Sequence, residues 1–406
     1  MEIDYKILPQ DYTVNKDITD ALGKTAVIIH LYYDDLFEDN LKYLRNIPGE
    51  IDAYIVTANR KLASMAREII RQECRTNFRV ISKPNRGRDY GALLVTCAEI
   101  LPKYSYVCFV HDKKSRPEDD PVLGQTWQTC LFECTLASGD YIRNVVNAFE
   151  EDPRLGFLSS PMSPESTLLS VDGALWTANY LACASFLKKL GVQKIPPVSE
   201  EPLYVGSAFW LRTAAIQKLL AFSFSSEDFP AEPMPEDGTI AHVLERAIGF
   251  VAEDAGYSTA FVMSVPYSRY FLTQKTKHLT KAMQVLRAAK MIAYTDNRVD
   301  FDRMLAITRK ETGLSDLTLF AVRYMRVFIL SESGCEEAVA ACRERLEKDG
   351  VIPGGVYLSP AIDQVTLLNP TNGFLLCASE QGEASYIELL NRHGRDDYFR
   401  ADMITE

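Results

Sequence analysis

Short apolar runs alternate with segments of helical periodicity through the first part of the chain. Four runs rich in β-branched and aromatic residues predict buried strands, at 26–33, 51–58, 78–82 and 104–110. Between them, apolar residues recur at helical spacing, at 35–47, 60–73 and 92–101. Strands that alternate with helices of this length form parallel sheets covered on both faces, so the pattern predicts an α/β domain.

The alternation continues less regularly to about residue 268. It predicts helices at 126–137, 139–151, 176–190 and from Thr239, and strands at 155–161 and 204–212. Beyond residue 268 the pattern is mostly helical, and a small mixed module follows at 335–406. We therefore expect a lead-in, an α/β domain of two halves and a mostly helical C-terminal extension, with bounds at 1–24, 25–125, 126–268 and 269–406.

Composition narrows the class of protein. The 406 residues are 47% hydrophobic and 24% charged, as in ordinary globular proteins, and the formal net charge of -11 argues against wholesale nucleic-acid binding. Nine cysteines are scattered without a CxxC pair, which is typical of reduced core cysteines. With a polar N-terminus and no apolar run of 18 residues, the chain is expected to be cytoplasmic.

The first candidate site is the loop from Asn85 to Gly91, between a predicted strand and a predicted helix. Ligands of parallel sheets bind at the carboxyl ends of the strands, which is where this loop falls. Two arginines can hold phosphate, two glycines allow a ligand close to the backbone, and Asp89 can accept hydrogen bonds from sugar hydroxyls. The alternative is a charged loop in which Asp89 caps the helix.

The second candidate is His111-Asp112-Lys113-Lys114, directly after an apolar strand. Two lysines can neutralise a leaving diphosphate without a metal ion. Asp112 is the one acidic residue in this tetrapeptide, and one carboxylate beside one histidine is a poor site for a hard cation. The alternative is a solvated charged turn.

The third candidate is Glu236-Asp237, just before a helix with an apolar stripe along one face. Asp237 is placed to act as a general base toward an acceptor hydroxyl, supported by Glu236 or Arg212. The competing interpretation is that Asp237 caps the helix, with Gly238 allowing the turn.

Aromatic and basic residues add weaker signals. Trp176 with Asn179, and Trp210, suit stacking on a sugar ring, although tryptophan is more often buried in a core. His30 and His242 fit structural roles better than catalytic ones. From Arg269 to Thr295 there are six basic residues and no acidic one, which indicates either a solvated helical face or contact with anionic lipid.

Taken in order, six motifs resemble the rhamnan synthesis protein F family of bacterial glycosyltransferases over roughly residues 25–268. They are HLYYDDLF from His30, NRGRDYG, HDKKS, WTAN from Trp176, GSAFWLR and EDGTIAHVLER. The resemblance implies an A-type glycosyltransferase fold with a Rossmann-like nucleotide-binding half and an acceptor-binding half. It places Asn85 and Gly87 on the nucleotide, and the acidic pair at the acceptor helix.

The resemblance also implies inverting transfer of L-rhamnose from dTDP-L-rhamnose to a cell-surface polysaccharide, with a lipid-linked acceptor at the inner face of the membrane. Another nucleotide sugar as donor, such as a galactofuranose donor, and a non-catalytic glycan-binding subunit stay open as alternatives. The chain lacks the paired acids that such transferases usually carry at His111-Asp112-Lys113. No cofactor is therefore firmly expected, and a divalent Mg or Mn ion at Asp112 remains open.

The residues assigned on these grounds fall into three groups. The catalytic residues are Asp237 and Glu236. The donor-binding residues are His30, Asn85, Arg86, Gly87, Arg88, Asp89, His111, Asp112, Lys113 and Lys114. The acceptor-binding residues are Trp176, Asn179, Trp210 and Arg212.

Overall fold

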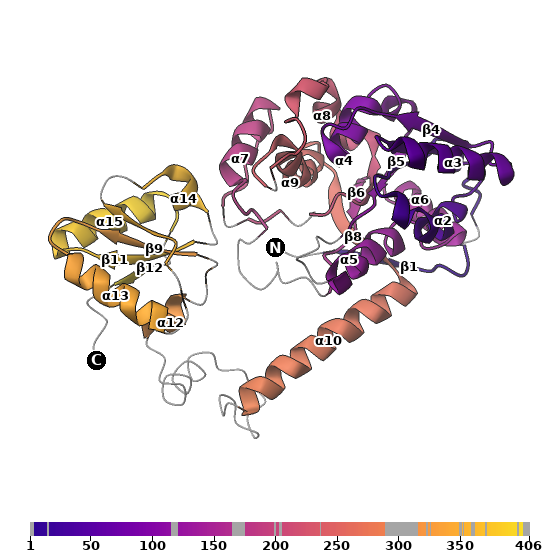
Figure 1. The fold of residues 1–406 in the computed structure, drawn as a ribbon. Helices are drawn as coiled ribbons and strands as arrows, with labels where there is room; N and C mark the ends of the chain where they lie inside the picture. The colour runs from indigo at the N-terminus through magenta and orange to yellow at the C-terminus, as the bar shows by residue number, and fades with distance from the viewer. Residues whose placement is uncertain are drawn as a thin grey trace. The chain divides into compact units, whose positions relative to one another are not determined.

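The computed structural model describes residues 4–13, 16–114, 121–164, 175–198, 200–202, 205–235, 237–288 and 316–400, the last range with short gaps at 322–323, 325, 349–350, 352, 359–361, 370–371 and 396–397. Contacts between residues divide the chain into two units (Figure 1). The first unit comprises Met1–Ser166, Ala182–Pro196 and Pro202–Gln274, and the second comprises Thr167–Leu181, Pro197–Glu201 and Lys275–Glu406.

The first unit is built on an eight-stranded sheet of order β1-β8-β6-β7-β5-β2-β3-β4. Its strands are β1 (Tyr5–Leu8), β2 (Thr25–His30), β3 (Asp52–Thr57), β4 (Phe78–Ser82), β5 (Tyr106–His111), β6 (Leu155–Ser159), β7 (Phe209–Arg212) and β8 (Ser258–Ser264). All neighbouring pairs are parallel except those of β7, which runs antiparallel to both β5 and β6. Seven strands therefore end at one edge, here named the carboxyl edge, and β7 begins there.

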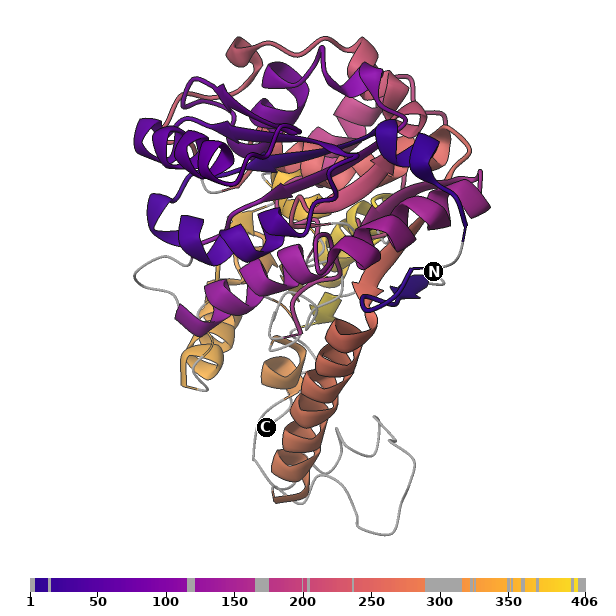
Figure 2. The ribbon, with the colours of Figure 1, turned by 90° about the vertical axis from the view of Figure 1, so that its right-hand side faces the viewer.

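Helices cover both faces of this sheet (Figure 2). One face packs against α2 (Phe37–Arg45), α3 (Arg60–Gln72) and α6 (Gly139–Glu151) in a continuous apolar core. On the other face lie α4 (Arg88–Gly91) and α9 (Ile240–Asp254), which contact each other. The central strands are therefore shielded on both sides, as their nearly continuous apolar sequences require.

Capping explains where two of the predicted helices begin. Asn59 accepts hydrogen bonds from the backbone N–H groups of Lys61 and Leu62 at the start of α3. Ser138 accepts one from Tyr141 at the start of α6. Each cap satisfies a backbone donor that has no partner inside the helix, so both helices start within one residue of their predicted positions.

The predicted α/β class is confirmed, and the differences concern single elements. Strands β1 and β8 were not predicted, because β1 is short and half polar and β8 lies in a segment read only as the end of the domain. The helix predicted at 92–101 is instead a π-helical turn at Ala92–Thr96 and a 3₁₀ turn at Leu101–Lys103.

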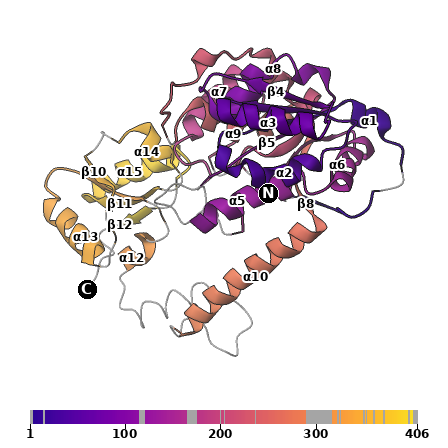
Figure 3. The same cartoon turned by 45° about the vertical axis from the view of Figure 1, so that its right-hand side comes forward.

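The second unit holds a parallel four-stranded sheet of order β10-β9-β11-β12. Its strands are β9 (Arg326–Ser331), β10 (Gly355–Leu358), β11 (Asn372–Cys377) and β12 (Tyr398–Arg400). Helix α13 (Glu336–Lys348) packs on one face and α15 (Glu380–Arg392) on the other, each with its own apolar core (Figure 3). The shorter helices of this unit are α12 (Asp316–Ala321) and α14 (Gln364–Leu368).

Helix α10 (Val265–Ala288) follows β8 directly and starts at the carboxyl edge. Within the described residues, no helix combines the length and apolar character needed to cross a membrane.

Candidate functional site

The carboxyl edge of the first unit brings most of the predicted donor-side residues together. His30 and His111 are the last residues of β2 and β5, and they are direct partners in the register of the sheet. Because β7 is antiparallel, the segment Gly206–Ala208 enters the sheet beside the end of β5. Helix α9 begins close by, so segments far apart in the sequence meet at this edge.

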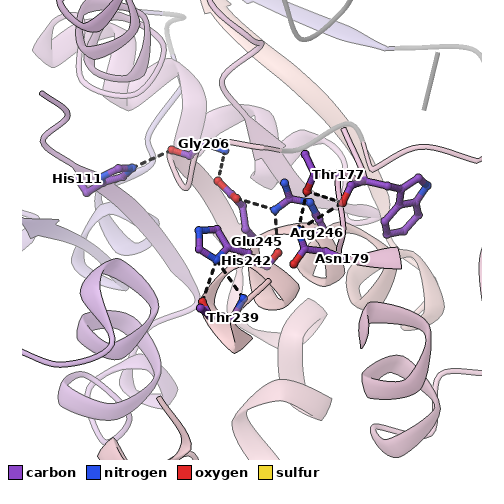
Figure 4. A network of polar contacts seen from close by, with 9 residues as sticks. His111, Thr177, Asn179, Gly206, Thr239, His242, Glu245 and Arg246 are labelled. Atoms are coloured by element: carbon purple, nitrogen blue, oxygen red, sulfur yellow. Dashed lines mark hydrogen bonds and ion pairs between the residues drawn. The ribbon is translucent and has the colours of Figure 1, made fainter. Parts of the chain in front are cut away.

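His111 joins the end of β5 to the segment that precedes β7 (Figure 4). Its Nδ1 lies 2.9 Å from the carbonyl oxygen of Asp112, and its Nε2 lies 3.0 Å from that of Gly206. A carbonyl oxygen only accepts, so the ring nitrogen is the donor in whichever of these contacts is a hydrogen bond. The amide of Gly206 in turn donates to Glu245 Oε1 at 2.6 Å, which extends the connection to α9.

Asp112 tethers the segment after β2 to the end of β5. Its carboxylate is 4% exposed and accepts hydrogen bonds from the amides of Tyr32 and Tyr33, each at 2.9 Å. Burial raises the pKa of Asp112 to about 6, against the opposing effect of these hydrogen bonds.

This geometry is a poor match to a divalent ion at Asp112. A hard cation takes six or more oxygen ligands, and the Asp112 oxygens already serve two backbone amides. Among the described residues, no group of three or more His, Cys, Asp and Glu side chains could hold a metal. The described residues around Asp112 therefore form no metal site by themselves.

Three titratable side chains, His30, Lys83 and Asp89, interact electrostatically at the loop from Asn85 to Gly91. Burial lowers the pKa of His30 to about 3, so this histidine is neutral, and its Nε2 has no hydrogen-bond partner in the described part of the chain. Burial also lowers the pKa of Lys83 to about 8, while Lys83 Nζ donates to the carbonyl of Arg86 at 2.8 Å. For Asp89, burial opposes ionisation, but the charge of His111 and the Ser207 hydroxyl outweigh it and lower the pKa.

The loop itself depends on two glycines. Gly87 has a φ of +75°, and a Cβ atom there would lie 2.9 Å from both Gly91 Cα and the Phe229 ring. A Cβ at Gly91 would lie 2.8 Å from the carbonyl oxygen of Arg86. Gly87 precedes α4, whose first residue is Arg88, so Asp89 is inside the helix and is not its cap.

Two loops that were predicted separately as donor and acceptor elements contact each other. Arg86 Nε donates to the carbonyl of Phe229 at 2.8 Å. Arg88 donates to the carbonyl of Met234 at 3.0 Å and lies 3.4 Å from a Glu232 carboxylate oxygen. These contacts join the loop around α4 to the loop that leads into α9.

The outer part of the carboxyl edge carries cations beside aromatic rings. Lys113 Nζ lies 4.9 Å from the centre of the Trp127 ring. Lys114 forms an ion pair with Asp35 and lies 5.7 Å from the Tyr33 ring centre. Asn85 is exposed at the same edge. This part of the edge offers positive charge and flat apolar surface, which suits a nucleotide diphosphate and its base.

The start of α9 separates the two interpretations of Asp237. The helix N-cap is Thr239, which forms a reciprocal capping box with His242. His242 Nδ1 lies 2.8 Å from Thr239 Oγ1 and 3.4 Å from the Thr239 amide (Figure 4). Asp237 is therefore not the cap, and its half-buried carboxylate acts electrostatically on His242.

His242 is held in its neutral form. Burial lowers its pKa, although Glu245 and Asp237 favour the charged ring. Its neighbour Arg246 is 6% exposed and donates to the carbonyl of His242 at 3.0 Å and to Glu245 Oε2 at 3.1 Å. Glu236, the other predicted catalytic residue, lies outside the described residues.

The structure places Arg212 and Trp210 away from this edge. Arg212 pairs with Tyr106 at the start of β5 and donates to the carbonyls of Phe149 and Leu155, at 2.7 and 3.1 Å. Trp210 is fully buried, and its Nε1 donates to the carbonyl of Thr135 at 3.1 Å. The cause is the direction of β7, which carries its C-terminal residues toward the opposite edge.

Trp176 and Asn179 belong to the second unit. Trp176 is fully buried, and its Nε1 donates to the carbonyl of Glu200 at 3.2 Å. Asn179 is also buried, and its Nδ2 donates to Thr177 Oγ1 at 2.7 Å. The buried ring of Trp176 leaves no free face for a sugar in this structure.

Comparison with known proteins gives a family match and distant relatives. The family model described as rhamnan synthesis protein F matches residues 2–257. The uncharacterized protein WxcX of Xanthomonas campestris pv. campestris, in strains B100 and ATCC 33913, is 27% identical over 238 residues. That alignment covers 58% of this chain and 32% of the relative, so the chain spans about a third of the length of the curated relatives it matches.

Among solved structures, one match is the mannosyltransferase PcManGT from Pyrobaculum calidifontis in complex with GDP-Man and Mn2+. The alignment covers 87% of this chain and 80% of that one, at 12% identity and a TM-score of 0.37. A likeness at this level carries no argument about the site.

Proposed function

We propose that this chain, which belongs to the rhamnan synthesis protein F family, is an inverting glycosyltransferase that moves a sugar from a nucleotide to an acceptor hydroxyl. The observation that carries the proposal is the convergence of three segments at the carboxyl edge. Arg86 and Arg88 join the loop around α4 to the loop that leads into α9, and His111 joins the end of β5 to Gly206, whose amide donates to Glu245 of α9. Ligands of such sheets bind at this edge.

The donor that fits the family best is dTDP-L-rhamnose, and the acceptor is a lipid-linked glycan of a growing cell-surface polysaccharide. The family's description, rhamnan synthesis, supports this choice. A β-linked donor and α-linked products require one displacement with inversion, which needs one general base and no covalent intermediate.

In the proposed reaction, Asp237 takes the proton of the acceptor hydroxyl while the oxygen attacks the anomeric carbon. The bond between that carbon and the diphosphate oxygen breaks, and its electron pair leaves with dTDP. Arg88, Lys113 and Lys114 stabilise the departing charge at the carboxyl edge. His242 lies within electrostatic reach of Asp237, and because burial lowers the pKa of His242, the neutral ring adds no positive charge that would oppose proton uptake by the carboxylate.

The test compares Asp237→Asn with Glu227→Gln, an exposed carboxylate elsewhere in the same stretch of loop. With dTDP-L-rhamnose and a synthetic octyl rhamnoside as acceptor, Asp237→Asn is expected to lower turnover by roughly 10²–10⁴-fold. Donor binding by calorimetry should change little, and Glu227→Gln should behave as wild type. Turnover near the wild-type rate in a folded Asp237→Asn protein would exclude Asp237 as the base.

A second arm tests the donor by thermal shift with dTDP-L-rhamnose, GDP-mannose and UDP-galactofuranose, each with and without Mn²⁺. We expect the largest stabilisation with dTDP-L-rhamnose and no further gain from Mn²⁺, because the Asp112 oxygens are occupied. A larger shift with another sugar nucleotide would keep the transferase and change its donor. No shift with any of the three would favour a glycan-binding subunit without catalysis.

A further inference from the structure

Helix α10 packs against the first unit at its beginning. Tyr267 and Phe271, 5% and 9% exposed, pack with Cys130, Cys134 and Met263 of the first unit. Leu272 is 59% exposed, and every side chain from Thr276 to Ala282 is exposed, Leu279 at 63%. Two leucines exposed to this degree on the same side of a helix, about two turns apart, point to a contact surface.

The charged side chains of α10 are all basic. No acidic residue occurs between Val265 and Ala288, in a chain whose formal net charge is -11. Lys277 and Lys281 are exposed. At about 100° per residue, Lys277 and Lys281 fall on one side of the helix, and Leu272, Leu279 and Met283 fall on the other, with Lys275 and Arg269 flanking the apolar residues.

We infer that α10 lies on the surface of a membrane rich in anionic phospholipid, with its leucines in the interface and its lysines against the headgroups. Such helices combine an apolar stripe, a basic polar face and low overall hydrophobicity, and all three hold here. The charge complementarity decides between partners. A second copy of this helix would bring like charges together, whereas an anionic surface attracts each lysine with about 1 kcal/mol.

The start of α10 belongs to the first unit, and this gives the inference a consequence. Strand β8 delivers the helix at the carboxyl edge, the same edge that carries His30, His111 and the loop around α4. A membrane-bound α10 would therefore hold this edge near the bilayer, where lipid-linked glycans are found. Lipid binding itself does not depend on the proposed reaction, and the experiment below measures binding alone.

The test is co-sedimentation of the full chain with vesicles of phosphatidylcholine alone or with 30% phosphatidylglycerol, at 50 and 300 mM NaCl. We expect binding to the anionic vesicles that falls steeply with salt. Lys277→Glu with Lys281→Glu should weaken it by tenfold or more. The matched control is Lys103→Glu with Lys188→Glu, two exposed lysines elsewhere that change the net charge equally. Leu272→Gln with Leu279→Gln tests the apolar stripe, with Leu358→Gln, another exposed leucine, as its control.

Three outcomes would overturn the inference. The first is equal sedimentation with neutral and anionic vesicles. The second is anionic binding that persists in both α10 double variants, which would assign it to another surface. The third is an oligomer, measured by light scattering, that the leucine variant dissociates while vesicle binding is absent, because the stripe would then join copies of the chain.

Discussion

Asp112 shows how a residue can stand at the expected place and serve a different purpose there. The sequence presents it as the acidic residue of the tetrapeptide His111–Lys114 that follows an apolar strand, and therefore as the nearest equivalent of a metal ligand. In the structure its oxygens accept the amides of Tyr32 and Tyr33, and it fixes the path of the chain after β2. Sequence spacing could not reveal this, because the amides come from a segment about 80 residues away.

The raised pKa of Asp112 makes its contribution to stability depend on pH. The folded pKa is about 6, above the usual value of about 3.9 for an unfolded chain, so the contribution is full below pH 4 and is lost as the pH rises through 6. The stability difference between wild type and Asp112→Asn should therefore shrink by about 1.4 kcal/mol from pH 5 to pH 7.5. Urea unfolding at the two pH values measures it.

Asp254 provides a control of opposite sign. Although burial raises its pKa, hydrogen bonds from Lys218 and from the Gln193 amide outweigh burial and lower it. Its stabilising effect is present at neutral pH and is lost as the pH falls through the folded pKa. The difference between wild type and Asp254→Asn should therefore stay nearly constant from pH 5 to pH 7.5 and decrease only below about pH 4, so a decrease in both variants from pH 5 to pH 7.5 would contradict the assignment for Asp112.

At the scale of elements, the start of α9 decides how Asp237 is understood. Capping boxes usually carry Glu or Gln at the third helical position, and this helix carries His242 there. The sequence signal for the cap was therefore missing, and Asp237 looked like the residue nearest to one. Because Thr239 and His242 cap the helix, the carboxylate of Asp237 is not its cap.

The capping box can be tested by two substitutions at one position. His242→Ala removes the side chain that accepts the Thr239 amide, and we expect it to lower the free energy of unfolding by about 1 kcal/mol. His242→Gln restores an ordinary capping box and should stay within about 0.5 kcal/mol of wild type. Equal losses in the two variants, measured by urea unfolding, would show that the ring is needed for something other than the cap.

Periodicity predicted most of the sheet, but it carries no information about strand direction. The runs that became β2, β3, β4 and β5 were all found, because buried parallel strands are continuous apolar segments. The run that became β7 was found as well, yet its antiparallel direction places Arg212 at the edge opposite His111. Direction depends on partners that are distant in sequence, and so do the contacts of Ser207, Glu245 and Trp127, which the sequence did not single out.

At the scale of the whole molecule, each of the two units is stabilised by an apolar core of its own. The core of the first unit includes the fully buried Leu158, and that of the second includes the fully buried Leu390. No strand of either sheet pairs with a strand of the other among the described residues. The two units are therefore expected to unfold in separate transitions.

Calorimetry of the full chain tests this with two matched substitutions. Leu158→Ala should lower the free energy of unfolding of one transition, and Leu390→Ala that of the other, each by roughly 2–5 kcal/mol, as is typical of a buried leucine. Neither substitution should shift the transition of the other unit. A ligand of the carboxyl edge should raise only the transition that Leu158→Ala lowers. A single transition shifted equally by both variants would mean that the units fold as one.

The antiparallel β7 has one more consequence, for how such a chain diversifies. β6 leaves the sheet at the carboxyl edge and β7 returns to it there, so residues 160–208 form an excursion with both ends at the same edge. A segment of this kind can be lengthened, shortened or exchanged between homologues without changing the order or direction of any strand. A change of acceptor specificity in this segment would therefore leave the sheet unchanged.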